Sequence, residues 1–256
     1  MRNRHGTPIW YELLTRDADA AQTFYSAVIG WSVSKPAGGL ERDYRIISTM
    51  DSAVGGLLRS PDDAGMAPQW LFYIGVDDVD AAAAKLNSLG GSVHVEPTDI
   101  PDVGRFAFVA DPQGAPFYLM RGASDEQSRS FAPTVAGHCA WNELAAANQD
   151  TALEFYQTMF GWTKGDVMPM GPMGDYSFIH HGDTMLGAMM NRPQDSTPPM
   201  WRYYFRVDDI DAINAAIAAN GGTLLHGPTE VPGGDWVIQA RDPQGAMIGF
   251  VGSRGA

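Results

Sequence analysis

The stretch TPIWYELLTRDADAAQTFYSAVIGW, residues 7–31, determines how the rest of the chain is interpreted. Pro8 to Leu14 is short and apolar, and this pattern predicts a β-strand. Asp17 follows as a candidate N-cap, because its carboxylate can accept hydrogen bonds from the first backbone N–H groups of a helix. The next apolar residues recur at helical spacing, at Ala20, Ala21, Phe24 and Tyr25. The stretch therefore predicts a strand followed by a helix.

The same pattern returns later in the chain as HCAWNELAAANQDTALEFYQTMFGW, residues 138–162. Trp10-Tyr-Glu-Leu13 matches Trp141-Asn-Glu-Leu144, and Asp111-Pro-Gln-Gly114 matches Asp242-Pro-Gln-Gly245, both at an offset of 131. Tyr44 matches Tyr176 at an offset of 132, which indicates a one-residue insertion that is later compensated. Six of the seven Trp residues fall into such pairs, so the chain is a tandem duplication.

Each copy also contains two similar halves with the order β-α-β-β-β. In the first half of copy one, short strands are expected near Ser32–Ser34, Tyr44–Ser48 and Ser52–Leu58. In the second half, a strand is expected over Trp70–Val76, a helix from Asp78 or Asp80 through Leu89, and strands near Ser92–Val95, Arg105–Ala110 and Pro116–Met120. This order predicts an α+β fold with copy one at 1–121, a linker at 122–136 and copy two at 137–256.

Bulk composition excludes several classes of protein. The formal net charge is −13, which disfavours nucleic acid because phosphate binding depends on Lys and Arg. The single cysteine, Cys139, cannot form an internal disulfide, and a reducing cytoplasm is the expected location. We find neither a signal peptide nor an apolar segment of membrane-spanning length. The expected partner is a small-molecule ligand, and a homodimer is left open.

Three motifs together resemble the vicinal oxygen chelate superfamily, which includes glyoxalases, bleomycin-resistance proteins and extradiol dioxygenases. They are the Asp17 to Trp31 opening, the Val76-Asp-Asp78 helix start and the Asp-Pro-Gln-Gly turn. The resemblance covers both copies and is closest to the tandem two-domain, glyoxalase-like branch. It implies that each copy's two modules form a half-open barrel of eight strands around a cleft.

The resemblance also implies where a metal site would lie. Metal enzymes of this superfamily place His, Gln or Glu on the first and fifth strands and near the end of the eighth. The corresponding residues here are Trp10, Leu71 and Tyr118 in copy one and Trp141, Arg202 and Gly249 in copy two. None of these is a ligand of that type, so no metal cofactor is predicted. A displaced divalent-metal site around Glu143 with His138, His180 or His181 remains as the alternative.

Strand period two predicts which side chains line each cleft. In copy one the cleft-facing set is Trp10, Glu12, Leu71, Tyr73 and Tyr118, while Tyr11 and Phe72 pack on the helices. In copy two the set is Trp141, Glu143, Arg202, Tyr204 and Arg206, with Gly249 leaving space. Ligand binding is predicted for the aromatic residues and the two arginines of these sets, since aromatic walls with a few polar groups are typical of small-molecule pockets.

Each assignment has a structural alternative. Trp10 and Trp141 could fill the clefts, and Glu143 could form an internal ion pair with Arg202. Glu12 and Glu143 are the candidate catalytic residues, as general bases. Met168, Met170 and Met173 lie in a Gly/Pro-rich stretch that predicts a loop, with a lid as the alternative.

Three functions follow from these readings. The first is a metal-independent binder of a small planar or aromatic molecule. The second is an enzyme, namely a lyase, isomerase or ring-cleaving dioxygenase with a displaced metal or a Glu general base. The third is a protein-interaction module with filled clefts.

Overall fold

The computed structural model describes residues 2–35, 42–61, 65–193 and 198–255. Copy one contains β1 (Pro8–Thr15), α1 (Ala18–Val28), β2 (Ser32–Ser34), β3 (Tyr44–Ser48), β4 (Ala53–Arg59), β5 (Gln69–Gly75), α2 (Val79–Ser88), β6 (Ser92–Ile100), β7 (Gly104–Ala110) and β8 (Pro116–Gly122). Copy two contains β9 (Cys139–Ala146), α3 (Gln149–Phe160), β10 (Thr163–Pro169), the 3₁₀ turn η1 (Gly171–Met173), β11 (Asp175–His181), β12 (Thr184–Asn191), β13 (Met200–Val207), α4 (Ile210–Ala219), β14 (Thr223–Glu230), β15 (Trp236–Arg241) and β16 (Met247–Gly252). The predicted β-α-β-β-β order is confirmed in all four modules.

The helices begin where their capping residues predict. The Asp17 side chain accepts hydrogen bonds from the backbone N–H groups of Asp19 and Ala20 at the start of α1. Asp78, rather than Asp80, caps α2 by accepting from the N–H of Ala81. Asn148 and Asp209 cap α3 and α4 in the same way. These side chains satisfy N–H groups that have no partner within the helix.

The strands form two eight-stranded sheets, one in each copy. Their orders are β2-β3-β4-β1-β5-β8-β7-β6 and β10-β11-β12-β9-β13-β16-β15-β14, so the two copies share one topology. Within the modules β1 runs parallel to β4, with Glu12 opposite Gly56, and β9 runs parallel to β12, with Glu143 opposite Ala188. The sheets do not close, as the predicted half-open architecture requires.

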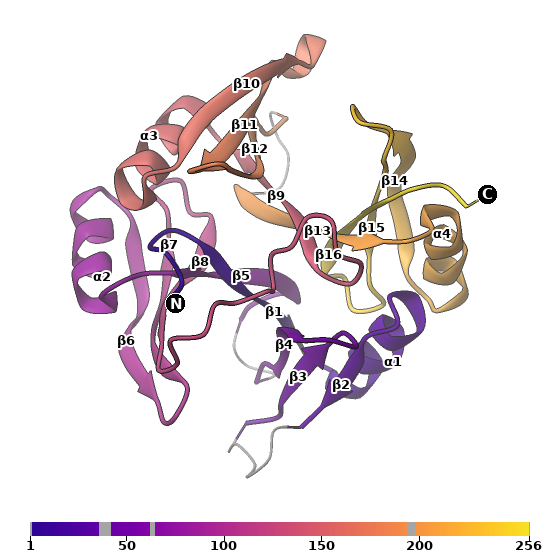
Figure 1. Cartoon of the computed structure of the whole chain (residues 1–256), viewed down its shortest axis with the longest axis horizontal. Helices are drawn as coiled ribbons and strands as arrows, with labels where there is room; N and C mark the ends of the chain where they lie inside the picture. Colours follow the sequence, from indigo (N-terminus) through magenta and orange to yellow (C-terminus); the bar gives the residue numbers. More distant parts are fainter. Residues whose placement is uncertain (1, 36–41, 62–64, 194–197, 256) are drawn as a thin grey trace. The chain divides into compact units, whose positions relative to one another are not determined.

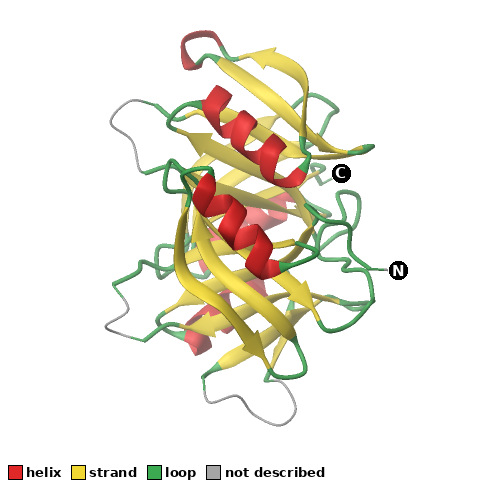
Figure 2. Cartoon of the chain, turned by 90° about the vertical axis from the view of Figure 1, so that its left-hand side faces the viewer, coloured by secondary structure: helices red, strands yellow, loops and turns green. Residues whose placement is uncertain are grey.

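The compact units in space differ from the two copies in sequence. One unit, called unit 1 here, contains residues 1–9, 72–128 and 141–202, and the other, unit 2, contains residues 10–71, 129–140 and 203–256. Each unit therefore combines a module from copy one with a module from copy two. Figure 1 shows α2 beside α3 in unit 1 and α1 beside α4 in unit 2. Figure 2, which faces the side on which α2 and α3 lie in Figure 1, shows helices lying against strands.

A buried Trp–Tyr–Asp chain connects the two modules of each unit. In unit 2, Trp70 Nε1 donates to Tyr25 Oη at 3.0 Å, and Tyr25 Oη donates to Asp242 Oδ2 at 3.0 Å. In unit 1, Trp201 Nε1 donates to Tyr156 Oη at 2.9 Å, and Tyr156 Oη donates to Asp111 Oδ2 at 3.1 Å. The Phe-Tyr motif of one copy thus binds the Asp-Pro-Gln-Gly turn of the other.

The glutamine of each turn makes a second connection. Gln113 Oε1 accepts from the backbone N–H of Asn148 at 2.8 Å, and its Nε2 donates to the Asn148 carbonyl at 2.8 Å. Gln244 makes the same two bonds to the backbone of Asp17. Because Asn148 and Asp17 are N-caps, each turn fixes the start of a helix in the other copy.

Strand residues of the other copy contact the buried rings of Tyr11 and Phe72. In unit 2, Tyr11 lies edge-on to Tyr203 and Phe205, with ring centroids 5.3 and 5.8 Å apart. In unit 1, the ring centroid of Phe72 lies 5.0 Å from that of Trp201. Periodicity identified both residues as buried, and the structure adds these contacts between residues that are distant in sequence.

Cys139 is fully buried on β9, as expected of a small core residue. Among the described residues, no helix has both the length and the apolar character needed to cross a membrane.

Removal of the buried tyrosine hydroxyls tests the connection between modules. We expect Tyr25→Phe and Tyr156→Phe each to lower the free energy of unfolding by about 1–3 kcal/mol, because a buried Trp N–H and a carboxylate each lose their partner. Urea unfolding measures this, with the fully exposed Met50→Ala as the control. A change no larger than the control's would show that these hydroxyls do not hold the modules together.

The two turn aspartates predict a pH dependence of stability. Burial raises the pKa of the Asp111 and Asp242 carboxyls above the ordinary value of 3.8. A carboxyl that binds its proton more tightly in the native state stabilises it below pH 3.8 and loses this contribution as pH rises through the native pKa. We therefore expect the wild type to lose stability relative to Asp111→Asn/Asp242→Asn as pH rises from about 4 to 7, because only the wild-type carboxyls lose their protons. A difference that does not depend on pH would contradict the raised pKa values.

Candidate functional site

A Trp–Tyr–Glu cluster lies in the first module, within unit 2. Trp10 and Glu12 are on β1 and Tyr44 is on β3. Trp10 Nε1 donates to Tyr44 Oη at 2.9 Å, and the Tyr44 hydroxyl is hydrogen-bonded to the Glu12 carboxylate. Burial, followed by the negative charge of Glu12, raises the pKa of the Tyr44 hydroxyl well above its usual range. The hydroxyl therefore stays protonated and can donate to Glu12.

A glycine makes room for this arrangement. A Cβ atom at Gly56 would collide with the Tyr44 hydroxyl and ring. Gly56 lies opposite Glu12 in the β1–β4 ladder, so the absent side chain leaves space beside the carboxylate. Glu12 is only 2% exposed, while Trp10 and Tyr44 are half-buried. The indole is thus anchored at its N–H edge and still partly accessible.

The third module repeats the cluster within unit 1 and adds a cation. Trp141 Nε1 donates to Tyr176 Oη at 2.9 Å, and Tyr176 Oη donates to Glu143 Oε2 at 2.9 Å. Arg202 Nη1 donates to the other oxygen of Glu143 at 3.2 Å. The internal ion pair considered from the sequence is therefore present.

The two tyrosine hydroxyls are the part of the site that sequence reasoning missed. Tyr44 and Tyr176 form a repeat pair at an offset of 132, which was a usable signal. Their strands are not adjacent to β1 or β9 in the sheets, however, so strand alternation alone does not connect them to Trp10 or Trp141.

Tyr73 and Tyr118 lie together in unit 1. They are opposite each other in the β5–β8 ladder, and their rings stack at 4.2 Å with an angle of 12°. Phe108 lies against Tyr118, with centroids 4.9 Å apart. Tyr73 is 8% exposed and Tyr118 is 7% exposed. These two predicted ligand-binding residues form one compact aromatic stack.

Tyr204 and Gly249 are neighbours in unit 2. A Cβ atom at Gly249 would collide with the Tyr204 ring, so this ring occupies the room that the sequence suggested Gly249 would leave. The expectation of space there was wrong, because an aromatic neighbour on β13 covers the glycine. Gln239 Nε2 donates to Tyr204 Oη at 2.6 Å, which fixes the ring.

Arg206 is engaged within unit 2. Its Nη2 forms an ion pair with Asp235, and its Nε donates to the carbonyl oxygen of Pro133. Arg202 and Arg206 are the two arginines predicted to bind a ligand. Arg202 uses fewer of its N–H groups in hydrogen bonds within the protein than Arg206 does.

The residues at the family's metal-ligand positions do not fit a metal ion. The indole N–H groups of Trp10 and Trp141 are donors, and both are used in hydrogen bonds to tyrosine. Arg202 is cationic, Leu71 is a buried aliphatic residue, and the Tyr204 ring covers Gly249. Divalent metals require imidazole, thiolate or oxygen donors.

The histidines of copy two do not complete a displaced site. His138 Nε2 faces Asp51 at 3.5 Å, and its Nδ1 lies against the carbonyl oxygen of Arg129. His180 packs over Gly165, whereas burial and the positive charge of Arg4 lower the pKa of His181. Within the described ranges, no three His, Cys, Asp or Glu side chains form a group that could hold a metal ion.

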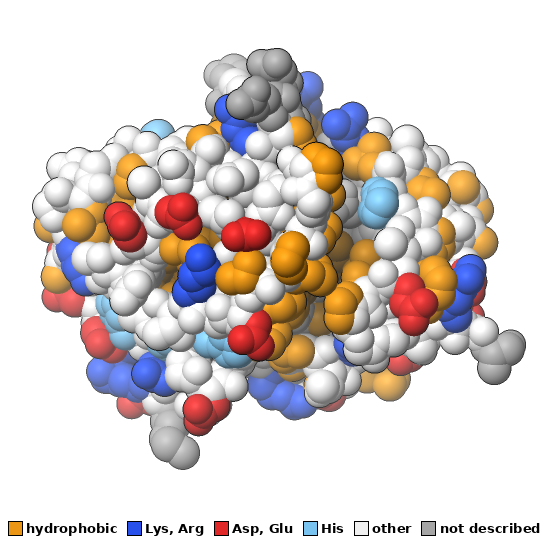
Figure 3. Space-filling view, turned by 90° about the horizontal axis from the view of Figure 1, so that it is seen from above, with side chains coloured by type: hydrophobic (Ala, Val, Ile, Leu, Met, Phe, Trp, Pro, Cys, Tyr) orange, Lys and Arg blue, Asp and Glu red, His pale blue; other side chains and the backbone are white. Residues whose placement is uncertain are grey.

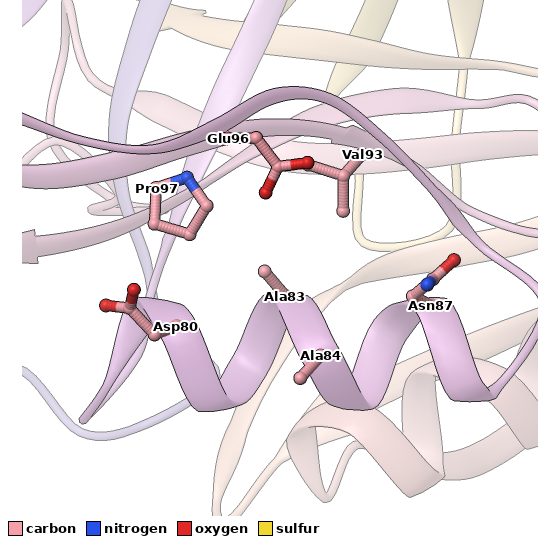
Figure 4. A pocket seen from close by; sticks show the side chains of 7 residues that line it. All are labelled: Asp80, Ala83, Ala84, Asn87, Val93, Glu96 and Pro97. Carbon is pink, nitrogen blue, oxygen red and sulfur yellow. The ribbon is translucent and has the colours of Figure 1, made fainter.

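A surface hollow of about 420 Å³ lies between α2 and β6 in unit 1, and no residue of either cluster lines it. Figure 4 shows helix residues on one side and strand residues on the other; together they are Asp80, Ala83, Ala84, Asn87, Val93, Glu96 and Pro97. Asp80 is paired with Arg105 at 2.7 Å. None of the predicted site residues lines this hollow.

On the face shown in Figure 3, side chains of Lys and Arg lie among side chains of Asp and Glu. Such mixing suits solubility better than it suits phosphate binding.

The chain belongs to the Glyoxalase/Bleomycin resistance protein/Dioxygenase superfamily, whose family model matches residues 8–119 and 136–250. It is 36% identical over 251 residues to the "Putative glyoxylase CFP32" of Mycobacterium tuberculosis (strain CDC 1551 / Oshkosh), covering 96% of this chain and 94% of that protein. It is 29% identical over 264 residues to the anthracycline biosynthesis protein DnrV of Streptomyces peucetius, covering 96% of this chain and 93% of that protein.

Solved structures share the fold. The Mn(II)-bound glyoxalase from Novosphingobium aromaticivorans has a TM-score of 0.68 at 18% identity, covering 99% of this chain and 84% of that one. A variant of homoprotocatechuate 2,3-dioxygenase from B. fuscum has a TM-score of 0.70 at 15% identity, covering 99% and 73%. At 18% and 15% sequence identity, the similarity to these two structures shows only that the fold is shared.

The donor chemistry of the clusters leads to a prediction about metals. We expect the protein, purified without chelator and exchanged into metal-free buffer, to retain no stoichiometric manganese, iron, nickel or zinc, because Trp10, Trp141 and Arg202 supply no metal donors. Elemental analysis by mass spectrometry measures this. About one equivalent of a metal per chain would show a displaced site and favour the enzyme interpretation.

Proposed function

We propose that this protein binds a small planar or aromatic molecule at its Trp–Tyr–Glu clusters, without the metal ligands that the family's metal enzymes use. One observation carries the proposal. In both copies an indole takes the first-strand position, and a tyrosine hydroxyl held by a buried glutamate anchors its N–H edge. No metal cofactor is needed for this role.

The anchoring supports binding for an energetic reason. A side chain that is already fixed in place loses little conformational entropy when a ligand contacts it. The Trp10 and Trp141 side chains are half-buried, so part of each remains accessible for stacking on a planar ring. Stacking on an aromatic side chain contributes about 1–3 kcal/mol where it has been measured for nucleobases.

The relatives' names agree with this class of ligand. Two Streptomyces relatives are named anthracycline biosynthesis proteins. An anthracycline contains a planar fused-ring chromophore, which is the shape that an anchored indole would accommodate. The relation supports a planar aromatic ligand and does not specify its identity.

An enzyme is the second candidate. Glu12 and Glu143 are buried carboxylates beside a tyrosine hydroxyl, an arrangement that could transfer a proton, and a relative is named a glyoxylase. On this alternative the protein would be a lyase, isomerase or dioxygenase. A cytoplasmic location suits both candidates, because the single buried Cys139 needs no oxidising compartment.

A binding experiment tests the proposal. We expect 2-methoxyanthraquinone, a neutral planar probe, to bind the protein, and Trp10→Leu or Trp141→Leu to weaken binding about tenfold or more because a stacking surface is lost. Isothermal titration calorimetry measures the affinity. Trp236→Leu is the matched control, because this part-exposed tryptophan lies outside both clusters beneath the Arg254 guanidinium.

Two results would change the conclusion. Equal affinities in wild type, Trp10→Leu and Trp141→Leu would remove the clusters as the binding site. Conversion of a bound aromatic molecule that is abolished by Glu12→Gln or Glu143→Gln, in variants that remain folded, would establish the enzyme instead.

A further inference from the structure

The guanidinium of Arg202 has hydrogen-bonding capacity that its present contacts do not use. Its side chain is 22% exposed, and Nη1 donates to Glu143 Oε1 at 3.2 Å. Its Nε is buried and has no hydrogen-bond partner among the residues that the structure describes. A buried donor without an acceptor is unfavourable, and the part-exposed remainder of the guanidinium offers further N–H donors to a ligand oxygen.

Glu143 holds the Arg202 guanidinium in place but accepts a hydrogen bond from only one of its nitrogen atoms, Nη1. The Oε1 atom accepts from Arg202, and the Oε2 atom accepts from Tyr176 at 2.9 Å. An arginine in a bidentate pair gives two parallel N–H bonds to one carboxylate. Here the two oxygens of Glu143 serve two different donors, so further N–H groups of Arg202 remain for a second acceptor.

Soft and aromatic side chains flank Tyr176 and Trp141 of the same cluster. In the ladders of unit 1, Tyr176 lies opposite Met168 on β10 and opposite Met190 on β12. Met168 therefore lies on a strand, and the loop predicted there from the sequence was wrong. Phe178 lies edge-on to Trp141, with centroids 5.8 Å apart. All of these side chains are half-buried, and thioethers adapt readily to the shape of a ring.

Copy one differs at the corresponding positions. Leu71 replaces Arg202, Leu58 replaces Met190, and Ile46 replaces Phe178. The Trp–Tyr–Glu cluster is therefore shared by the two copies, whereas the guanidinium of Arg202 and the Met and Phe side chains beside Tyr176 and Trp141 belong to copy two.

We propose that the copy-two cluster binds the ionised oxygen of a planar phenol, with Arg202 as its hydrogen-bond donor and positive charge. This inference rests on the proposed function and adds the chemical class of ligand for one of the two clusters. The cationic guanidinium of Arg202 attracts a phenolate more strongly than a neutral phenol. Glu143 and Tyr176 act as positioning residues.

A hydroxylated dye provides the test. 2-Hydroxyanthraquinone changes its visible absorption when its hydroxyl ionises, and 2-methoxyanthraquinone is its non-ionising counterpart. With protein in excess, we expect the hydroxyl of the bound dye to ionise at a pH about one unit lower than that of the free dye, which corresponds to roughly tenfold tighter binding of the phenolate.

Three variants assign this shift to Arg202. In Arg202→Met/Glu143→Gln, which leaves no buried charge unpaired, we expect the dye to bind and the shift to be lost. In Arg202→Lys, which keeps the charge but not the planar fork, a smaller shift is expected. Trp236→Leu, which lies outside both clusters beneath the Arg254 guanidinium, is expected to leave the shift unchanged. Circular dichroism verifies that each variant is folded.

The outcomes separate this inference from the proposed function. If the methoxy probe binds through Trp10 and Trp141 but the hydroxylated dye shows no shift in the wild type, the inference fails and the proposed function stands. A shift that persists in Arg202→Met/Glu143→Gln also overturns the inference. If neither dye binds the wild-type protein, both fail.

Discussion

A buried tyrosine hydroxyl between a tryptophan and an aspartate is the interaction on which this structure depends. Tyr25 and Tyr156 each accept from an indole and donate to the turn aspartate of the other copy. Because both partners are buried, loss of the hydroxyl would leave two polar groups unsatisfied. Both copies are therefore needed for the buried core, because each copy supplies the aspartate that the tyrosine of the other copy binds.

The same chemical arrangement recurs at the candidate site with a different third partner. In both clusters an indole N–H donates to a tyrosine hydroxyl, which is hydrogen-bonded to a glutamate instead of an aspartate. In the core the rings are fully buried, whereas at the clusters they are half-buried. An anchored but accessible aromatic ring is what distinguishes a binding surface from a packed core.

The two copies have diverged at this site while their fold stayed the same. Arg202 introduces a positive charge where copy one has the buried aliphatic residue Leu71. A guanidinium supplies a fixed charge and directional donors, and these can hold an anionic oxygen without a metal. The clusters therefore share a way of presenting an aromatic surface and differ in the polar group beside it.

Local periodicity, capping residues and motifs such as Asp-Pro-Gln-Gly were enough to predict the duplication, the β-α-β-β-β modules and the family. Strand alternation also placed Trp10, Glu12, Trp141 and Glu143 on one face of their strands. The contacts of Tyr44 and Tyr176 with these pairs, the cover of Gly249 by Tyr204 and the combination of modules from different copies in each compact unit emerge only in the folded chain. The reason is physical: strand period fixes the direction of a side chain, whereas its partners come from strands that are distant in sequence, and only the packed chain brings them together.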